Sequence, residues 1–273
     1  MSTTETEEIV VAEETGERAG TLWAYRVGTL LIGVVLFGIW ELLPRTGIVD
    51  PIILPPFTHV AYALYTLVRQ DFFLTHFLVT LNEMVVGFVL GTIIGLVGGI
   101  VLAVWQPVKR VTYPYVVAFQ ATPKIVFAPL FIAWFGFGQM SKIVTAVVIC
   151  FFPVLLNTMV GLESVPEDAR RLMRSLRATR LQLFWKVSFL HALPIIFAGI
   201  EAAFVFAVVG AIVGEFVGAQ HGLGYLLELY SFQLRIDRMF AVIIILAVVG
   251  VVGYFLLAWA GRRLIFWHED RGQ

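Results

Sequence analysis

The sequence has few charged residues, and this scarcity excludes an ordinary soluble domain. Of its 273 residues, 14% are charged and 59% are hydrophobic. A soluble domain of this length needs far more polar surface, since about a quarter of its residues are normally charged. The composition therefore predicts a polytopic membrane protein. The formal net charge is zero, so no global field indicates nucleic acid as a partner.

Residues that build catalytic and metal sites are also scarce. The single cysteine, Cys150, excludes an intrachain disulfide and a Cys-rich metal site. The five histidines show no ligand spacing, and no Gly-x-Ser-x-Gly or His-Glu-x-x-His motif occurs. None of the four lysines follows a glycine, so there is no phosphate-binding Walker loop. We expect no catalytic residue, metal or cofactor in this chain. If ATP drives transport here, the ATPase must be another chain.

Six apolar stretches are long enough to cross a bilayer, which takes about 20 residues. A thirteen-residue stretch, 57–69, is too short to span and predicts an interfacial helix. We expect residues 1–20 to form a disordered acidic tail, 21–54 to hold the first span and its outer loop, and 263–273 to form a second tail. The expected spans are 25–43, 75–105, 111–135, 143–162, 193–217 and 239–260.

Basic residues are distributed unequally between the two sides of these spans. The side with both termini has thirteen Lys and Arg residues and the other side has five, with Lys124 left in the membrane. Positive charge concentrates on the cytoplasmic side of membrane proteins. The pattern therefore predicts a multi-pass protein of the cytoplasmic membrane with both termini in the cytoplasm.

Residues 163–187 form a long polar interruption between the fourth and fifth spans. Pro166 and the two acidic residues after it predict a helix start, and a second helix at 181–190 leads to Pro194. Two short helices lying on the membrane would contact anionic lipid or offer a docking surface to a cytoplasmic partner. The loop contains six of the nineteen Lys and Arg residues: Arg170, Arg171, Arg174, Arg177, Arg180 and Lys186.

Charged residues inside the spans need a reason, because each costs about 2.5–3.5 kcal/mol at the bilayer centre. Lys124 follows Pro123 in a proline-interrupted span, where it lines a substrate path, pairs with a carboxylate, or extends to the cytoplasmic interface. Glu83, Glu201 and Glu215 are further candidates for the path. The alternatives are an interfacial position for Glu83 and polar contacts between helices for the other two.

Small residues recur every four positions in two spans, which places them on one helix face. Such faces allow two helices in lipid to approach closely. We expect both faces to serve helix packing. They comprise Gly87, Gly91, Gly95 and Gly99 in the second span and Gly199, Ala203, Ala207 and Ala211 in the fifth.

Four blocks of the sequence resemble one family. They are ATPKIVFAPLFIAWFGFGQMSKI, CFFPVLLNTMVGLESV, LMRSLRATRLQLFWKVSFLHALP and GEFVGAQHGLGYLL. Together they resemble the permease subunits of bacterial ABC importers of the nitrate, sulfonate and taurine type, particularly the branch for thiamine pyrimidine precursors and riboflavin. The match covers about residues 55–262. It implies the all-α fold of type I importer permeases, with six transmembrane helices and a five-helix core at 55–262.

The resemblance assigns a role to the polar loop. In the family this loop is the coupling helix, which seats in a groove of the ATPase and transmits its closure to the spans. The family pattern Glu-Ala-Ala-x-x-x-Gly is altered here, because its triplet is Arg171-Leu172-Met173 and its glycine, where the family makes a turn, is Arg177. The implied coupling residues are Glu167, Asp168, Arg171, Leu172, Met173, Arg174, Ser175, Arg177 and Pro194.

The resemblance also implies partners and a class of substrate. The partners are a second permease copy, ATP-binding subunits and a soluble or lipid-anchored substrate-binding protein, and the glycine face and the 121–138 block would line or flank the path. We expect a small vitamin or precursor, such as riboflavin or a hydroxymethylpyrimidine, with sulfonate, taurine or nitrate as the alternative. Glu201, where many members have arginine, suits a less anionic substrate. The rival classes are an ion-coupled secondary transporter using Glu83 and Glu201, and a membrane-embedded enzyme.

Overall fold

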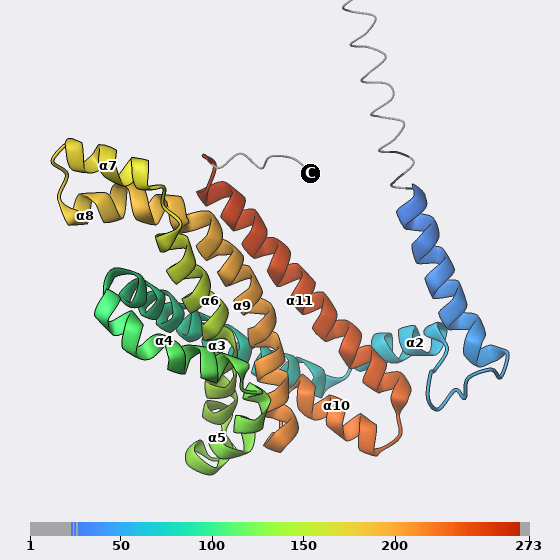
Figure 1. The fold of residues 1–273 in the computed structure, drawn as a ribbon. Helices are drawn as coiled ribbons and strands as arrows, with labels where there is room; N and C mark the ends of the chain where they lie inside the picture. Colours follow the sequence, from blue (N-terminus) through green and yellow to red (C-terminus); the bar gives the residue numbers. More distant parts are fainter. Residues whose placement is uncertain (1–22, 24, 26, 268–273) are drawn as a thin grey trace, which may run out of the picture. The chain divides into compact units, whose positions relative to one another are not determined.

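A computed structural model describes Trp23, Tyr25 and residues 27–267 of the chain (Figure 1). The expected tail at 1–20 and the last six residues of the tail at 263–273 lie outside the described residues. Every regular element in the described part is helical. The chain divides into two compact units, Met1–Tyr65 and Thr66–Gln273.

The first unit contains one long apolar helix, Val27–Arg45, and the start of α2 (Phe57–Val68). The carboxylate of Glu41 accepts hydrogen bonds from the backbone N–H of Thr58 (3.0 Å) and from its hydroxyl (2.9 Å). Because the first N–H groups of a helix have no partner within it, this carboxylate completes the start of α2. The indole of Trp40 donates to the carbonyl of Pro55 (3.0 Å) and fixes the proline-containing loop between the helices.

Four long helices form the second unit. They are α3 (Asp71–Val104), α6 (Gln139–Glu163), α9 (Phe189–Gly218) and α11 (Ile236–Leu264). Helix α6 packs against both α3 and α9, and α11 packs against α9 and the short α10 (Leu223–Phe232). Within the described residues, five helices are long and apolar enough to cross a membrane, and a bent pair provides a sixth span. The expected six-span, all-α fold is confirmed.

The glycine face of α3 lies directly against α6. A methyl group added at Gly95 would lie 2.6 Å from the carbonyl oxygen of Phe151, and one added at Gly99 would lie 2.6 Å from that of Leu155. The same face continues as a three-helix junction, because Ala146 of α6 faces Gly87 of α3. It also faces Gly210 of α9. Only glycine allows these backbones to approach so closely.

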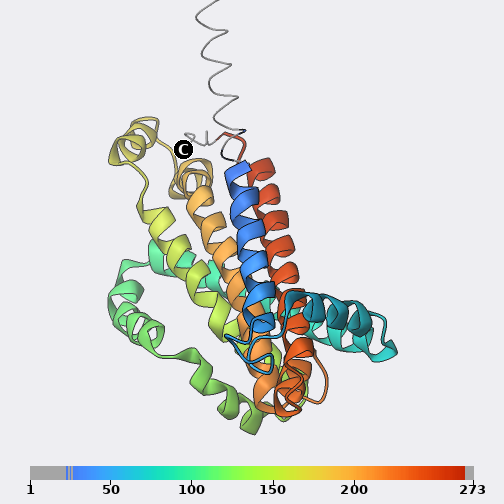
Figure 2. The same cartoon turned by 90° about the vertical axis from the view of Figure 1, so that its right-hand side faces the viewer.

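The third expected span is bent. Helix α4 (Gln106–Ala121) ends before Pro123, a 3₁₀ turn follows at Lys124–Phe127, and α5 (Ala128–Phe135) leaves at 90° to α4. Proline restricts the residue before it to extended backbone, so Thr122 cannot continue the helix. Figure 2 shows the α4–α5 pair standing away from α11. No described residue of α4 is buried.

The polar loop forms α7 (Glu167–Ser175) and α8 (Arg180–Leu183), at the end of the unit opposite α5 and α10 (Figure 1). The sequence predicts a separate second helix at 181–190. Instead, α8 continues through a π-helical turn, Phe184–Ser188, into α9 as one helical segment of 39 residues. No glycine or proline occurs between Arg180 and Pro194, so nothing in this stretch breaks the helix.

Candidate functional site

The α7–α8 loop, residues 166–183, presents an apolar surface at the end of the helix bundle. Leu172, Leu176 and Leu181 each expose more than half of their surface. Met173 is half-buried, whereas Arg171 and Arg174 are exposed. Exposed leucines surrounded by basic side chains are typical of a surface that a partner covers.

Local interactions shape α7 and attach it to the bundle. Pro166 precedes its first turn, and the exposed carboxylate of Glu167 lies 3.5 Å from Arg174 and 3.9 Å from Arg171. Exposed ion pairs of this kind contribute little stability. The guanidinium of Arg170, by contrast, donates to the carbonyl of Leu162 at the end of α6 (3.2 Å). This hydrogen bond joins α7 directly to the end of α6.

Helix α7 ends at Ser175, and two residues later Arg177 occupies the position of the family glycine. The backbone of Arg177 is left-handed, with φ of +54°. Its N–H donates to the carbonyl of Arg174 (2.9 Å), and that of Ala178 donates to the carbonyl of Met173 (3.0 Å). This pair of bonds is the Schellman motif, in which glycine is usual. The turn is therefore present without the glycine.

An ion pair missed by the sequence analysis joins α4 to α6 near the same end. The ammonium of Lys109 lies 2.5 and 2.6 Å from the two carboxylate oxygens of Glu163, the last residue of α6. The two residues are 54 positions apart and belong to different expected loops. No spacing in the sequence relates them. Through Glu163 and Leu162, the end of α6 contacts both the α7–α8 loop and the bent pair.

A second group of polar residues lies inside the opposite end of the bundle. His76, Thr80 and Glu83 of α3, Lys142 of α6 and Glu215 of α9 are all buried, and we call them the buried polar cluster. Thr80 donates its hydroxyl proton to Glu215 (2.6 Å), and one carboxylate oxygen of Glu83 has no hydrogen-bond partner. Counting back from Gly87 in steps of three and four residues predicts that the α3 members face the other helices.

The buried polar cluster holds the start of α10. The backbone N–H groups of Gly222, Leu223 and Gly224 donate, respectively, to His76 Nδ1 (2.9 Å), Thr80 Oγ1 (2.7 Å) and Glu215 Oε2 (2.5 Å). These N–H groups have no partner within the helix, so the cluster satisfies them. At Gly222, φ is +123°, and a Cβ would collide with the Glu215 carboxylate. The Gly-Leu-Gly sequence therefore fits against these side chains.

Lys142 belongs to this cluster, although the expected spans at 111–135 and 143–162 leave it in the loop between them. Helix α6 begins at Gln139, three residues before it. The ammonium group donates to the carbonyls of Phe137 (2.6 Å) and Gly218 (2.7 Å). These bonds join the segment just before α6 to the last residue of α9. A buried ammonium needs such partners.

The other path candidates lie apart from one another. Pro123 is at the bend after α4, and the Lys124 ammonium donates to the carbonyl of Gln120 (3.1 Å) and lies 4.7 Å from the centre of the Phe152 ring. Glu83 is buried inside the helix bundle, at the end opposite α7. Glu201 lines a different region, between α9 and α11. The structure therefore does not bring Glu83 and Glu201 together.

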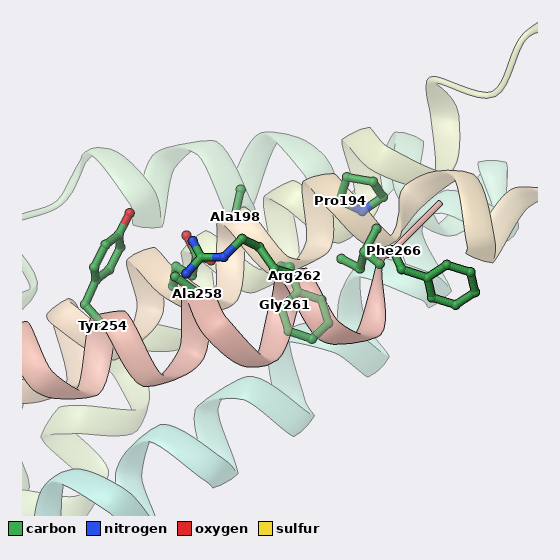
Figure 3. A pocket seen from close by; sticks show the side chains of 10 residues that line it. Pro194, Ala198, Tyr254, Ala258, Gly261, Arg262 and Phe266 are labelled. Atoms are coloured by element: carbon green, nitrogen blue, oxygen red, sulfur yellow. The ribbon is translucent and has the colours of Figure 1, made fainter. Parts of the chain in front are cut away.

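Glu201 lines a cavity of about 560 Å³ between α9 and α11, near the end that carries α7. Figure 3 shows Arg262 reaching from the last turn of α11 toward Ala198 and Ala258, with Tyr254 farther along the same helix. Among the described residues, no three His, Cys, Asp or Glu side chains are grouped as a metal site would require.

The sequence is similar to known transport permeases. It is 35% identical over 237 residues to a Haemophilus influenzae protein named "Probable ABC transporter permease protein", covering 87% of this chain and 96% of the relative. It is 33% identical over 241 residues to the formylaminopyrimidine transport permease ThiX of Halalkalibacterium halodurans (88% and 96%). It is 27% identical over 249 residues to the taurine transport permease TauC of Escherichia coli (89% and 90%).

The fold is also known from solved structures. A structure of the methionine ABC transporter MetNI superimposes with a TM-score of 0.59 at 24% identity, covering 71% of this chain and 94% of that chain. Residues 87–266, about two thirds of the sequence, match the family described as binding-protein-dependent transport system inner membrane component. With its all-α, multi-span fold, this chain belongs to that family, the permeases of ABC importers.

Proposed function

We propose that this chain is the transmembrane subunit of an ATP-driven importer for a small vitamin precursor. A separate subunit hydrolyses ATP, and a substrate-binding protein delivers the substrate on the outer side. The observation that carries the proposal is the α7–α8 loop, whose exposed leucines stand at one end of the helix bundle. The excess of basic residues on that side supports a cytoplasmic position for the loop and both termini.

In this proposal the loop transmits movement of the ATPase to the bent pair. Closure of the ATPase displaces α7, and Arg170 passes the displacement to Leu162 at the end of α6. The ion pair of Lys109 and Glu163 then carries it to α4, which leads to the bend at Pro123. Packed helices respond to such a displacement by moving as rigid elements. The bend is where access to the path changes.

The α4–α5 pair faces a second copy of the chain and lines the path between the copies. Helix α4 has no buried residue within the described chain, yet it contains polar side chains such as Thr112 and Gln120. Polar groups in a membrane span normally face other helices or water rather than lipid. Lys124 at the bend belongs to the same surface. Glu215 instead holds the start of α10 on the outer end of the core, through the Gly224 N–H, and lies in the same buried cluster as Glu83.

A nitrogen-containing vitamin precursor or riboflavin is the proposed substrate. The similarity to the formylaminopyrimidine permease supports this choice, and the lower identity to the taurine permease makes a sulfonate the alternative. The test is ATP-dependent uptake in proteoliposomes containing this chain, its ATPase and its binding protein. We expect labelled pyrimidine or riboflavin to accumulate and labelled taurine to remain outside. Accumulation of taurine alone would replace the vitamin assignment and leave the importer assignment intact.

The docking surface is tested separately with Leu172→Asp. A carboxylate on this leucine, which is 61% exposed, would disrupt an apolar contact with the ATPase, so uptake should fall while the protein still inserts. Leu264→Asp is the matched control, since Leu264 is 59% exposed near the end of α11, on the same side of the unit. Equal uptake by both variants would remove α7 as the docking element.

A further inference from the structure

The seam between α9 and α11 contains three adjoining hollows. Pro194 lines both the cavity with Glu201 and a smaller hollow of about 340 Å³ that contains Lys186 and Trp267. Tyr254 lines both the Glu201 cavity and an apolar hollow of about 690 Å³. Since neighbouring hollows share residues, they form one groove along the seam. The groove begins beside the helix that continues from α8 and runs toward α10.

The two ends of this groove differ in chemistry. The end near α8 contains the cations of Lys186 and Arg262 and one carboxylate, Glu201, which lies beside Gly261. No described acidic side chain forms an ion pair with Arg262, whose side chain lies in the cavity (Figure 3). The apolar hollow has twelve lining residues, of which Tyr254 alone has a polar side chain.

The dimensions of the groove match one leaflet of a bilayer. Twelve residues separate Arg262 from Gly250 along α11, which corresponds to about 18 Å at the helical rise. One leaflet contributes about 15 Å, half of the hydrocarbon core. A chain anchored at the basic end therefore reaches the apolar hollow. The occupant must have a negative head group and an apolar tail of this length.

We propose that the seam binds one anionic phospholipid with a single phosphate, such as phosphatidylglycerol. The phosphate lies between Lys186 and Arg262, and one acyl chain follows the groove past Tyr254. Basic pockets between helices at the cytoplasmic side are suited to such head groups. The two cations and the carboxylate of Glu201 give the lining one net positive charge. This charge matches a lipid with one phosphate and disfavours a lipid with several phosphates. Because the helices span the membrane, phospholipid adjoins the groove.

The test uses the full-length chain in nanodiscs with trace photoactivatable phosphatidylglycerol, and mass spectrometry locates the label. We expect label on α9 and α11, and we expect Lys186→Gln with Arg262→Gln to reduce it by about tenfold. Arg263→Gln is the matched control, because Arg263 does not line the groove and lies over the Trp259 ring. Label that persists in the double variant, or equal labelling by phosphatidylcholine, would overturn the proposal.

A second variant tests the tail site without changing charge. A Cβ at Gly250 would have no atom within 4 Å, so Gly250→Trp fills the apolar hollow without a local clash of the backbone. We expect it to abolish labelling of the seam, whereas Val252→Trp, on the same helix but outside the hollow, leaves it unchanged. Gel filtration checks that both variants remain folded. A disulfide between Gly250→Cys and Val34→Cys would show that the first helix fills the seam and exclude the lipid.

Discussion

The backbone N–H of Ala178 donates to the carbonyl of Met173 and closes the end of α7 around a left-handed arginine. A side chain in this conformation costs about 1–2 kcal/mol relative to glycine. Arg177→Gly should therefore stabilise the folded protein, although glycine returns part of the gain by loosening the unfolded chain. We expect a net gain of about 0.5–1 kcal/mol. Thermal unfolding in detergent measures it. Ala178→Gly is the control and should bring no gain, and a lower melting temperature for Arg177→Gly would show that the arginine side chain stabilises the turn.

The hydroxyl of Thr80 donates to Glu215 and accepts from the N–H of Leu223, so its removal should be costly. Thr80→Val leaves the Leu223 N–H and an oxygen of Glu215 without this partner. Each unsatisfied buried group costs about 1–3 kcal/mol, and we expect a loss of about 2–4 kcal/mol in equilibrium unfolding. Thr92→Val on the same helix is the control, because the buried hydroxyl of Thr92 has no partner to lose. Equal losses would assign the effect to shape rather than to the hydrogen bonds.

The close approach of α3 and α6 makes a further prediction. In Gly95→Ala the new methyl group would lie 2.6 Å from a backbone carbonyl, which can move away only by separating the helices. We expect a loss of about 1–3 kcal/mol in unfolding measurements. At Gly98 the nearest atom is the end of the Leu155 side chain, 3.2 Å away, which can rotate. Gly98→Ala should therefore be nearly neutral. A tolerated Gly95→Ala would contradict the helix spacing described above.

The proposed contact between two copies of α4 can be tested by cross-linking. Tyr115→Cys places a thiol on the exposed surface of α4, and the natural Cys150 is buried and cannot compete. Oxidation in native membranes should produce a disulfide-linked dimer. Val97→Cys, exposed on α3, is the control and should remain monomeric. The reverse result would move the interface from α4 to α3.

The spans and the close-packed faces were predictable because each depends on a pattern within one segment. A run of apolar residues identifies a span, and glycines four residues apart identify one helix face. The relationship of Lys109 to Glu163 has no such pattern, since it arises from how separate helices meet. The expected spans end at 135 and resume at 143, which leaves Lys142 in a loop, whereas helix α6 already begins at Gln139. The partners of the Lys142 ammonium are backbone carbonyl oxygens, which every residue has, so the sequence does not predict them.

The bend after α4 was only partly predictable. Three prolines occur in the segment. Pro114 lies inside α4, which continues past it. Pro129 lies in the first turn of α5, where the missing N–H would have had no partner in the helix. Only Pro123 coincides with the break. The residue type is the same in all three cases, and the position within the helix decides its effect. The sequence predicts a helix at 181–190 separate from the span at 193–217, but α8 continues into α9 because no residue there breaks the helix.

The sulfur of Cys150 touches the position where Gly91 would carry a side chain, between α3 and α6. A thiol reagent can reach this sulfur only when the two helices separate. Its rate of alkylation therefore measures how often the core opens locally, just as amide hydrogen exchange measures the opening of protected backbone groups. With ATP and the partner subunits present, the same reaction would report whether the transport cycle loosens this helix pair or moves it as one piece.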